Sequence, residues 1–401
     1  MVRAEQRPGR RRAEPPPRRL RRSSDRGRNN HPAPKSDPQA DRPTPPPEPA
    51  RPARSARPAE RARPSKPPKS PRPKRSSRLL FAASTTLWLA LLAIGLVAVV
   101  APWTPIEVPD FVPLAGAVTI TTLFTHGLAV RSGGRALVSG VLALVLAGGA
   151  AFSQNEILLA GATVGTAVVS ALLAVLSTTP AAKFSAVVRE VTVAAVVAVI
   201  GAFAVRAYGA EVSLERTGYL AIGFSLIAAL ALVYRLGAGL TGLGRRGLVM
   251  IISGVALLTI TLAYTEALAA WGSPAMIETI DDTFARLSEL LGAVPRPIEV
   301  LLGFPALAWG VSTRARRRQG WWVCAFGAPG MSVIAVSLLD PDVALVEAGL
   351  SVLYSLGLGL LVGYGIIRAD LFLTGARGRR ARQLEELAAH RPEPGRLQPL
   401  L

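Results

Sequence analysis

The chain has 401 residues, half of them hydrophobic, and yet it carries a formal net charge of +20. Residues 1–78 hold 24 Lys and Arg against 7 Asp and Glu, whereas the remaining residues are nearly balanced in charge and contain apolar runs of about 20 residues. Runs of that length span a hydrocarbon core about 30 Å thick, so composition excludes a water-soluble globular protein.

The basic N-terminal segment, residues 1–78, also holds 19 of the 33 prolines and very few apolar residues. Such a segment cannot bury enough surface to offset the entropy of ordering the chain, so we predict a disordered cytoplasmic tail. Its role is open between an orientation signal, attraction to anionic lipid headgroups and docking of a protein partner. Nucleic acid is not an expected partner, because no aromatic residues are interleaved to stack on bases.

The first apolar run, residues 79–101, has 23 residues. The apolar core of a signal peptide has only about 7–15 residues, so this run predicts a first membrane span. Further runs follow, and together they predict a bundle of about ten transmembrane helices between residues 79 and 367. The expected spans are 79–101, 111–130, 136–153, 157–178, 185–207, 218–237, 247–268, 297–312, 321–339 and 343–367.

Charge predicts which side of the membrane each connection faces. If ten spans start from a cytoplasmic tail, the connections on the inner side together with Arg189 hold 11 basic groups and one acid, Glu190. The outer side then holds 14 acids and four arginines. Enrichment of Lys and Arg in short cytoplasmic loops is the rule for membrane proteins. We therefore expect a multi-pass plasma-membrane protein with both termini in the cytoplasm.

Two smaller patterns predict local contacts within the spans. Arg189 and Glu190 are adjacent on a helix, where side chains point about 100° apart, so we expect no pairing between them and expect Arg189 to reach toward the cytoplasmic boundary. The spacings Gly161-x-x-x-Gly165 and Gly359-x-x-x-Gly363 predict close packing of helices.

The longest outer connection contains a predicted amphipathic helix near residues 274–292. Its apolar residues recur every three or four positions and therefore share one face, while Gly292 is suited to end the helix. Asp281 and Asp282 lie off that face. We expect this helix to rest on the bundle or on the outer leaflet.

Candidate site residues lie inside the spans, where ionisable groups are costly and are by default functional. Glu347, Ser351 and Tyr354 share one face of the last span, and Glu266 lies near the outer end of the seventh. Pro329 interrupts the ninth span within CAFGAPGMS, where a broken helix would free backbone groups to bind a ligand. We predict that these five residues bind a substrate, and we assign no catalytic residue.

No cofactor and no metal site are expected. Cys324 is the single cysteine, and the three histidines are scattered along the chain. The sequence also lacks a nucleotide-binding glycine loop, an HExxH motif and a GxSxG motif. Residues 368–401 are expected to form a second cytoplasmic tail, mostly disordered, with a short helix over ARQLEELAA.

Three functions are consistent with this layout. We favour a non-catalytic membrane protein of envelope assembly or cell division whose basic tail recruits partners. The alternatives are a transporter or flippase of a small or lipid-linked substrate, and a membrane-embedded glycan- or lipid-modifying enzyme that uses Asp281 and Asp282. In outline, the ten expected spans and long seventh-to-eighth connection resemble the polymerases that build bacterial cell-wall glycan. None of that family's sequence motifs is found, so no residue is assigned from it.

Overall fold

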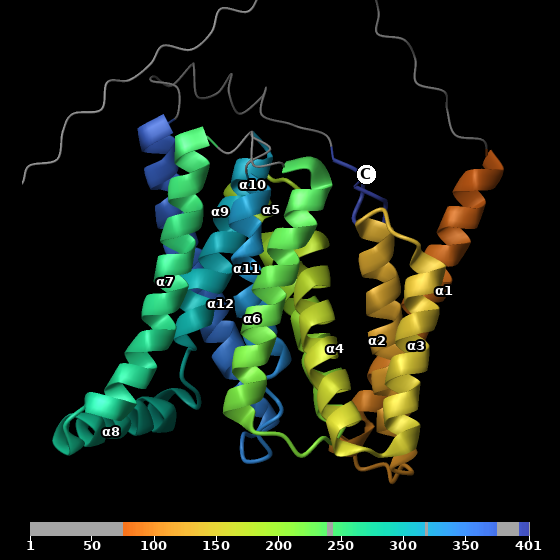
Figure 1. The fold of residues 1–401 in the computed structure, drawn as a ribbon, viewed down its shortest axis with the longest axis horizontal. Coiled ribbons are helices and arrows are strands. Elements are labelled where there is room, and N and C mark those ends of the chain that lie inside the picture. Colours follow the sequence, from red (N-terminus) through yellow and green to blue (C-terminus); the bar gives the residue numbers. More distant parts are fainter. Residues whose placement is uncertain (1–74, 239–243, 317–319, 375–392, 401) are drawn as a thin grey trace, which may run out of the picture. The chain divides into compact units, whose positions relative to one another are not determined.

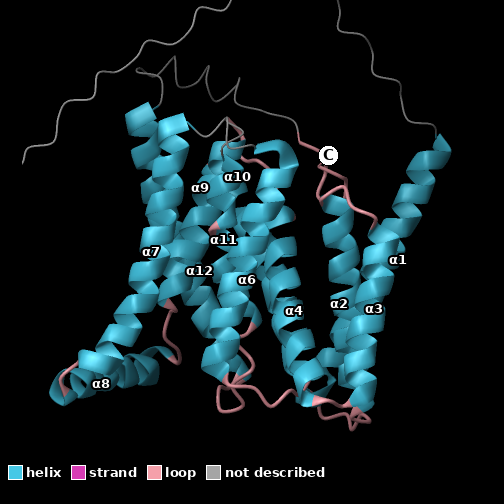
Figure 2. Ribbon diagram, viewed as in Figure 1, coloured by secondary structure: helices cyan, strands magenta, loops and turns pink. Residues whose placement is uncertain are grey.

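The fold was established from a computed structural model, which describes residues 75–238, 244–316, 320–374 and 393–400. Figure 2 shows that the described residues form helices joined by turns and loops, with no strand among them. The expected tail at residues 1–74 and the expected helix over ARQLEELAA lie outside the described residues.

Seven helices in the described part of the chain are long and apolar enough to cross a membrane. They are α1 (Arg75–Val100), α2 (Phe111–Arg131), α3 (Ala136–Ser153), α4 (Glu156–Leu176), α5 (Phe184–Ala207), α6 (Leu214–Val233) and α12 (Leu345–Thr374). The candidate span that begins in α1 continues through the short helix η1 (Ala101–Trp103), and that of α6 continues into the π-helical turn η2 (Tyr234–Ala238). The class of protein that this fold defines is an all-α membrane protein, as the sequence predicts.

Three further helical passes run between the same two ends of the bundle (Figure 1). One is α7 (Gly244–Trp271), the second joins η4 (Glu299–Gly303) to α9 (Phe304–Arg314), and the third joins α10 (Gly320–Ala325) to α11 (Gly327–Ala335). Their apolar stretches are shorter, as in Ile251–Tyr264 and Gly320–Ala335. A total of ten spans therefore stays a prediction.

The predicted amphipathic helix is present as α8 (Pro274–Leu291), and it turns away from the direction of α7 at one end of the bundle (Figure 1). Gly292 follows it with a φ of 76°, a left-handed conformation that costs glycine little because it has no Cβ. The glycine therefore ends α8 at the predicted place.

Two predicted boundaries shift in the structure. α1 begins at Arg75, four residues before the expected start at residue 79, and α12 continues to Thr374, seven residues beyond residue 367. Residues 393–400, expected within a mostly disordered tail, lie against the helix ends: Leu400 N donates to Arg131 O over 3.0 Å. Part of the second tail thus belongs to the folded bundle.

The interrupted helices pack through glycines. α10 ends at Ala325 and α11 begins at Gly327, so the break falls at Phe326 within CAFGAPGMS. Pro329, the predicted point of interruption, lies instead in the first turn of α11. A Cβ added to Gly303 would lie 2.7 Å from Gly330 Cα, and one added to Gly310 would lie 2.7 Å from Cys324 N. Small residues let helix backbones approach in lipid, where apolar surface alone gives little drive to associate.

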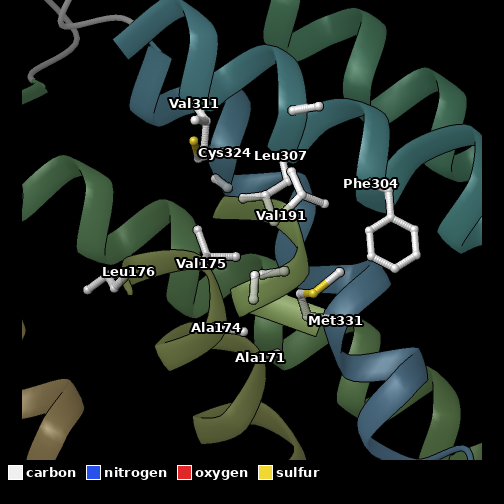
Figure 3. Close-up of a cluster of buried hydrophobic side chains, with 14 of the residues drawn as sticks. Ala171, Ala174, Val175, Leu176, Val191, Phe304, Leu307, Val311, Cys324 and Met331 are labelled. Carbon is white, nitrogen blue, oxygen red and sulfur yellow. The ribbon is translucent and has the colours of Figure 1, made fainter. Parts of the chain in front are cut away.

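The central core lies where α4, α5, α9, α10 and α11 meet (Figure 3). Small residues of α4, such as Ala171 and Ala174, pack with Leu307 of α9 and Met331 of α11. α3 instead exposes most of its apolar side chains, for example Leu137 and Leu146. Such a surface is ordinary for a helix in contact with lipid tails.

Candidate functional site

Two mostly apolar grooves of similar size lie among the described residues. One, of about 530 Å³, lies between α4 and α6, and the other is a lateral groove between α2, α3 and α4, which also borders a cluster of hydroxyl groups. The volume of the lateral groove is about 500 Å³, within the range of small-molecule sites. Leu142 and Leu146 of α3 and Ile157 and Leu158 of α4 line it, and all four side chains are more than half exposed on the protein surface. The groove therefore opens sideways, toward the position of lipid.

Two glycines of α4 make room for this groove. A Cβ added to Gly161 or to Gly165 would meet nothing within 4 Å, and both residues line the cavity. The prediction of close helix packing at this pair is therefore wrong. The same spacing at Gly359 and Gly363 does pack closely, since added Cβ atoms there would lie 2.6 Å from Phe304 Cβ and 2.9 Å from Ala308 Cβ.

A cluster of three hydroxyl groups borders the inner wall of the groove. Thr121 Oγ1 of α2 lies 2.8 Å from Thr166 Oγ1 of α4 and 2.8 Å from the hydroxyl of Tyr208, which follows α5. Thr121 Oγ1 also donates to Ala117 O over 2.8 Å. A hydroxyl has one proton and two lone pairs, so Thr121 accepts from both neighbours.

This arrangement leaves acceptor oxygens at the groove. Thr166 and Tyr208 each donate their hydroxyl hydrogen bond to Thr121. Thr121 and Thr166 both line the cavity. The remaining lone pairs of Thr166 can accept a hydrogen bond from a ligand. The groove is thus lined mostly by apolar side chains, with the hydroxyl-bearing residues Thr121, Thr125, Ser139 and Thr166 on its wall.

The sequence-predicted residues of α12 have partners elsewhere. Ser351 Oγ donates to Val294 O over 2.7 Å, and the Tyr354 hydroxyl donates to Leu291 O over 2.9 Å. These bonds fix the backbone that follows α8. Glu347 is half-buried in the first turn of α12, and no hydrogen bond or ion pair to it is found among the described residues. Whether these side chains bind a substrate stays a prediction.

Glu266 and Pro329 lie on separate elements. Glu266 of α7 accepts a hydrogen bond from the Tyr219 hydroxyl of α6. Pro329 is buried in α11, and its carbonyl accepts from Ser332 Oγ over 2.8 Å. Within the described residues no hydrogen bond or ion pair joins either of them to the polar residues of α12, so the structure does not unite the five predicted residues.

The carboxylates of the enzyme hypothesis are only partly described. Asp282 is exposed on α8, and the side chain of Asp281 lies outside the described part of the structure. An enzyme that uses this pair stays a prediction.

A buried ion pair lies on the side of the bundle where α8 is found. Glu299 of η4 is fully buried, and its Oε1 accepts from Arg296 Nη1 over 3.3 Å. Glu299 Oε2 is buried without a hydrogen-bond partner among the described residues. From sequence alone, Glu299 is counted among the 14 acids of the outer side. Its position two residues inside the expected eighth span, 297–312, is the sequence feature that indicates burial.

Two arginines that sequence reasoning counted as loop charges are also buried. Arg131 ends α2 and Arg314 ends α9, and each is only 1% exposed. Each stands at the edge of an arginine-containing connection, RSGGR or TRARRR, and nothing in that pattern distinguishes a buried arginine from a solvated one.

Arg189 and Glu190 do form an ion pair, which corrects the expectation from helix geometry. Arg189 Nη2 lies 3.0 Å from Glu190 Oε1, with the arginine side chain 67% exposed and the glutamate fully buried. The long arginine side chain reaches around the helix toward its neighbour, so the angle between the two Cβ directions does not prevent contact.

No family model, no curated protein and no solved structure matches this chain. The function therefore has to be argued from the geometry of the residues themselves.

Proposed function

We propose that this chain is a transporter or flippase that carries an amphiphilic, lipid-type substrate along the groove between α2, α3 and α4. The observation that carries the proposal is the lateral groove of about 500 Å³, which is lined mostly by apolar side chains and has exposed leucines of α3 and α4 along it. An acyl chain fits such a surface because its transfer from lipid requires no dehydration of polar groups. The hydroxyl cluster offers an acceptor for a polar substrate group.

Broken helices support the same proposal. The π-helical turn η4, which runs directly into α9, and the break at Phe326 between α10 and α11 lie in packed parts of the bundle. Helix interruptions in membrane proteins are tolerated where they are buried or line a cavity, and transporters use them to bind and to move. The five sequence-predicted residues remain a proposed second contact region for a substrate.

The groove predicts a specific effect of filling it. Gly161→Phe should abolish translocation of a tail-labelled fluorescent phospholipid across reconstituted phosphatidylcholine vesicles, because Gly161 lines the groove and its Cβ position is open, so the ring would take up space within the groove. The matched control is Gly357→Phe on α12. An added Cβ there also meets nothing within 4 Å, and Gly357 does not line the groove between α2, α3 and α4. Quenching by external dithionite measures the rate at which labelled lipid crosses the bilayer.

The outcome of this assay separates the groove from the rest of the bundle. Both variants should yield as much folded protein as the unsubstituted chain. If Gly161→Phe translocates lipid as fast as Gly357→Phe, the groove is not the route.

We further propose ten spans, a plasma-membrane location and cytoplasmic ends. The segregation of 11 basic groups from 14 acidic groups supports this orientation. The start of α1 and the described C-terminal residues lie at the same end of the helices in Figure 1, which is the relation that an even number of spans requires.

A role in envelope assembly or cell division is the second candidate, and the 24 basic residues within residues 1–78 favour it. Deletion of residues 1–70 should abolish recruitment of a partner or binding to anionic lipid and leave lipid translocation at its full rate. Flotation with vesicles measures binding to the partner or to anionic lipid, and the dithionite assay measures lipid translocation. Both measurements are made on the same preparation. Loss of translocation in the deletion variant would instead tie the tail to transport.

A further inference from the structure

Two buried guanidinium groups lie side by side at the C-terminal end of α4. Arg131 Nε donates to Leu176 O over 2.8 Å, and Arg314 donates to the hydroxyl of Thr178 over 2.8 Å and to Thr178 O over 3.1 Å. A helix ends in carbonyl groups without partners and in a partial negative charge, which makes this a favourable place for cations. Arg131 thus binds the last residue of α4, and Arg314 binds Thr178, two residues beyond that helix.

The opposite side of both arginines holds the chain's own C-terminal segment, residues 393–400. Arg131 Nη1 donates to the carbonyls of Pro394, Gly395 and Gln398 at 3.2, 2.7 and 2.9 Å. Arg314 Nη2 donates to Glu393 Oε2 over 2.5 Å. Arg131 Nη1 thus donates to three uncharged carbonyl oxygens, and Glu393 is the one residue of the segment that brings a negative charge to the two arginines.

The arginines are not fully satisfied by this segment. Arg131 Nη2 and Arg314 Nε are buried and have no hydrogen-bond partner among the described residues. Buried N–H groups of a cation are costly to leave unpaired. The site therefore has more donors than the segment and α4 together fill.

Charge around the pair is also unbalanced. Arg396 Nη2 and Arg189 Nη2 both pair with Glu190 Oε1, at 2.6 and 3.0 Å. The linked groups are then four arginines and two glutamates, a net charge of +2. If residues 393–400 leave, one arginine and one glutamate leave with them, and the remaining groups still carry +2.

We propose that Arg131 and Arg314 form a binding site for a phosphate group, which the C-terminal segment occupies in this structure and from which a phosphate-bearing ligand displaces it. A phosphate monoester brings a charge of about −2 and three acceptor oxygens, which match the excess charge and the unfilled donors. Arginine is the side chain best suited to this task, because its planar group binds two phosphate oxygens at once. The site is separate from the lateral groove and does not depend on the proposed function.

The segment is built to be exchanged. It has eight described residues, of which Gly395, Gln398 and Pro399 are exposed. Polar contacts hold most of it: the bonds from Arg131, the Arg314–Glu393 pair and the Arg396–Glu190 pair, with Leu400 as the residue that packs on the core.

A cavity of about 290 Å³ lies beside Leu397 and Pro399, lined on the other side by Trp88 of α1 and His126 of α2. Ser84 and Thr85 of α1 also line it, and Val130 beside Arg131 reaches it. The space would therefore suit the part of a lipid next to a phosphate headgroup.

Release of the segment can be measured on the full chain in phosphatidylcholine nanodiscs. A fluorophore is attached to a cysteine appended after Leu401, and Cys324 stays unlabelled because it is fully buried. Sodium phosphate should lower the anisotropy of the label with a saturable midpoint, whereas sodium chloride at the same ionic strength should not. Glu393→Gln should lower the phosphate midpoint about tenfold, because it weakens the charged bond that competes with phosphate.

Control measurements decide the proposal and the source of the phosphate. Glu215→Gln removes an exposed carboxylate at the other end of the bundle and should leave the midpoint unchanged. Release by soluble phosphate identifies a free phosphate ligand, and release only in nanodiscs that contain phosphatidic acid identifies a lipid headgroup. Release by chloride at equal strength, or no release by either phosphate source in the original chain and in Glu393→Gln, overturns the proposal.

Discussion

Replacement of Arg296 by Ala should lower the free energy of unfolding by about 3–5 kcal/mol, the cost of breaking a buried ion pair from one side. The side chain of Arg296 is 24% exposed, whereas Glu299 is fully buried, so the substitution leaves a carboxylate without its cation away from water. Glu299 Oε2 already lacks a hydrogen-bond partner among the described residues, and the described ion pairs give Glu299 no cation other than Arg296.

A second substitution tests the cause of this loss. Glu299→Gln in the Arg296→Ala background should recover most of the stability, because the amide removes the buried charge and keeps the shape of the side chain. Arg286→Ala on the exposed face of α8 is the matched control and should shift stability by no more than about 0.5 kcal/mol. Thermal unfolding in detergent, followed by tryptophan fluorescence, measures all four proteins. Equal losses for Arg296→Ala and Arg286→Ala would show that the ion pair does not stabilise the fold.

The sequence predicts the helices well because lipid imposes a simple requirement on them. A spanning segment must be apolar for about 20 residues and must satisfy its own backbone, and both conditions can be read from local composition. The long helices, the amphipathic helix α8 and a break within CAFGAPGMS are accordingly predicted from patterns within each segment. None of these depends on which helices become neighbours.

Which buried residues gather at one place depends on those neighbours, and local sequence patterns do not show them. Arg131 is buried because Leu176 of α4 and the C-terminal segment meet at its end, and the two partners are 45 and more than 260 positions away in the chain. Gly161 and Gly363 belong to equal spacings, yet one borders open space and the other touches α9. Local sequence gives the size of a side chain and not the surface that it faces.

The crossing of η4 and α11 depends on two such neighbours, and it yields the other large expected effect. Gly303→Val should lower the free energy of unfolding by about 1–3 kcal/mol or more, because its Cβ would lie 2.7 Å from Gly330 Cα. The atom it strikes belongs to the backbone, so a change of side-chain rotamer cannot relieve the overlap. α11 would have to move away from η4 as a whole.

The matched control for this crossing is Gly223→Val on α6, where an added Cβ meets nothing within 4 Å. It carries the same change in helix propensity, so the difference between the two variants reports the close approach alone. Size-exclusion chromatography of the detergent-solubilised protein and its unfolding temperature measure the effect. Equal unfolding temperatures would mean that η4 and α11 do not cross at these glycines, and the packing that places Glu299 in the interior would have to be different.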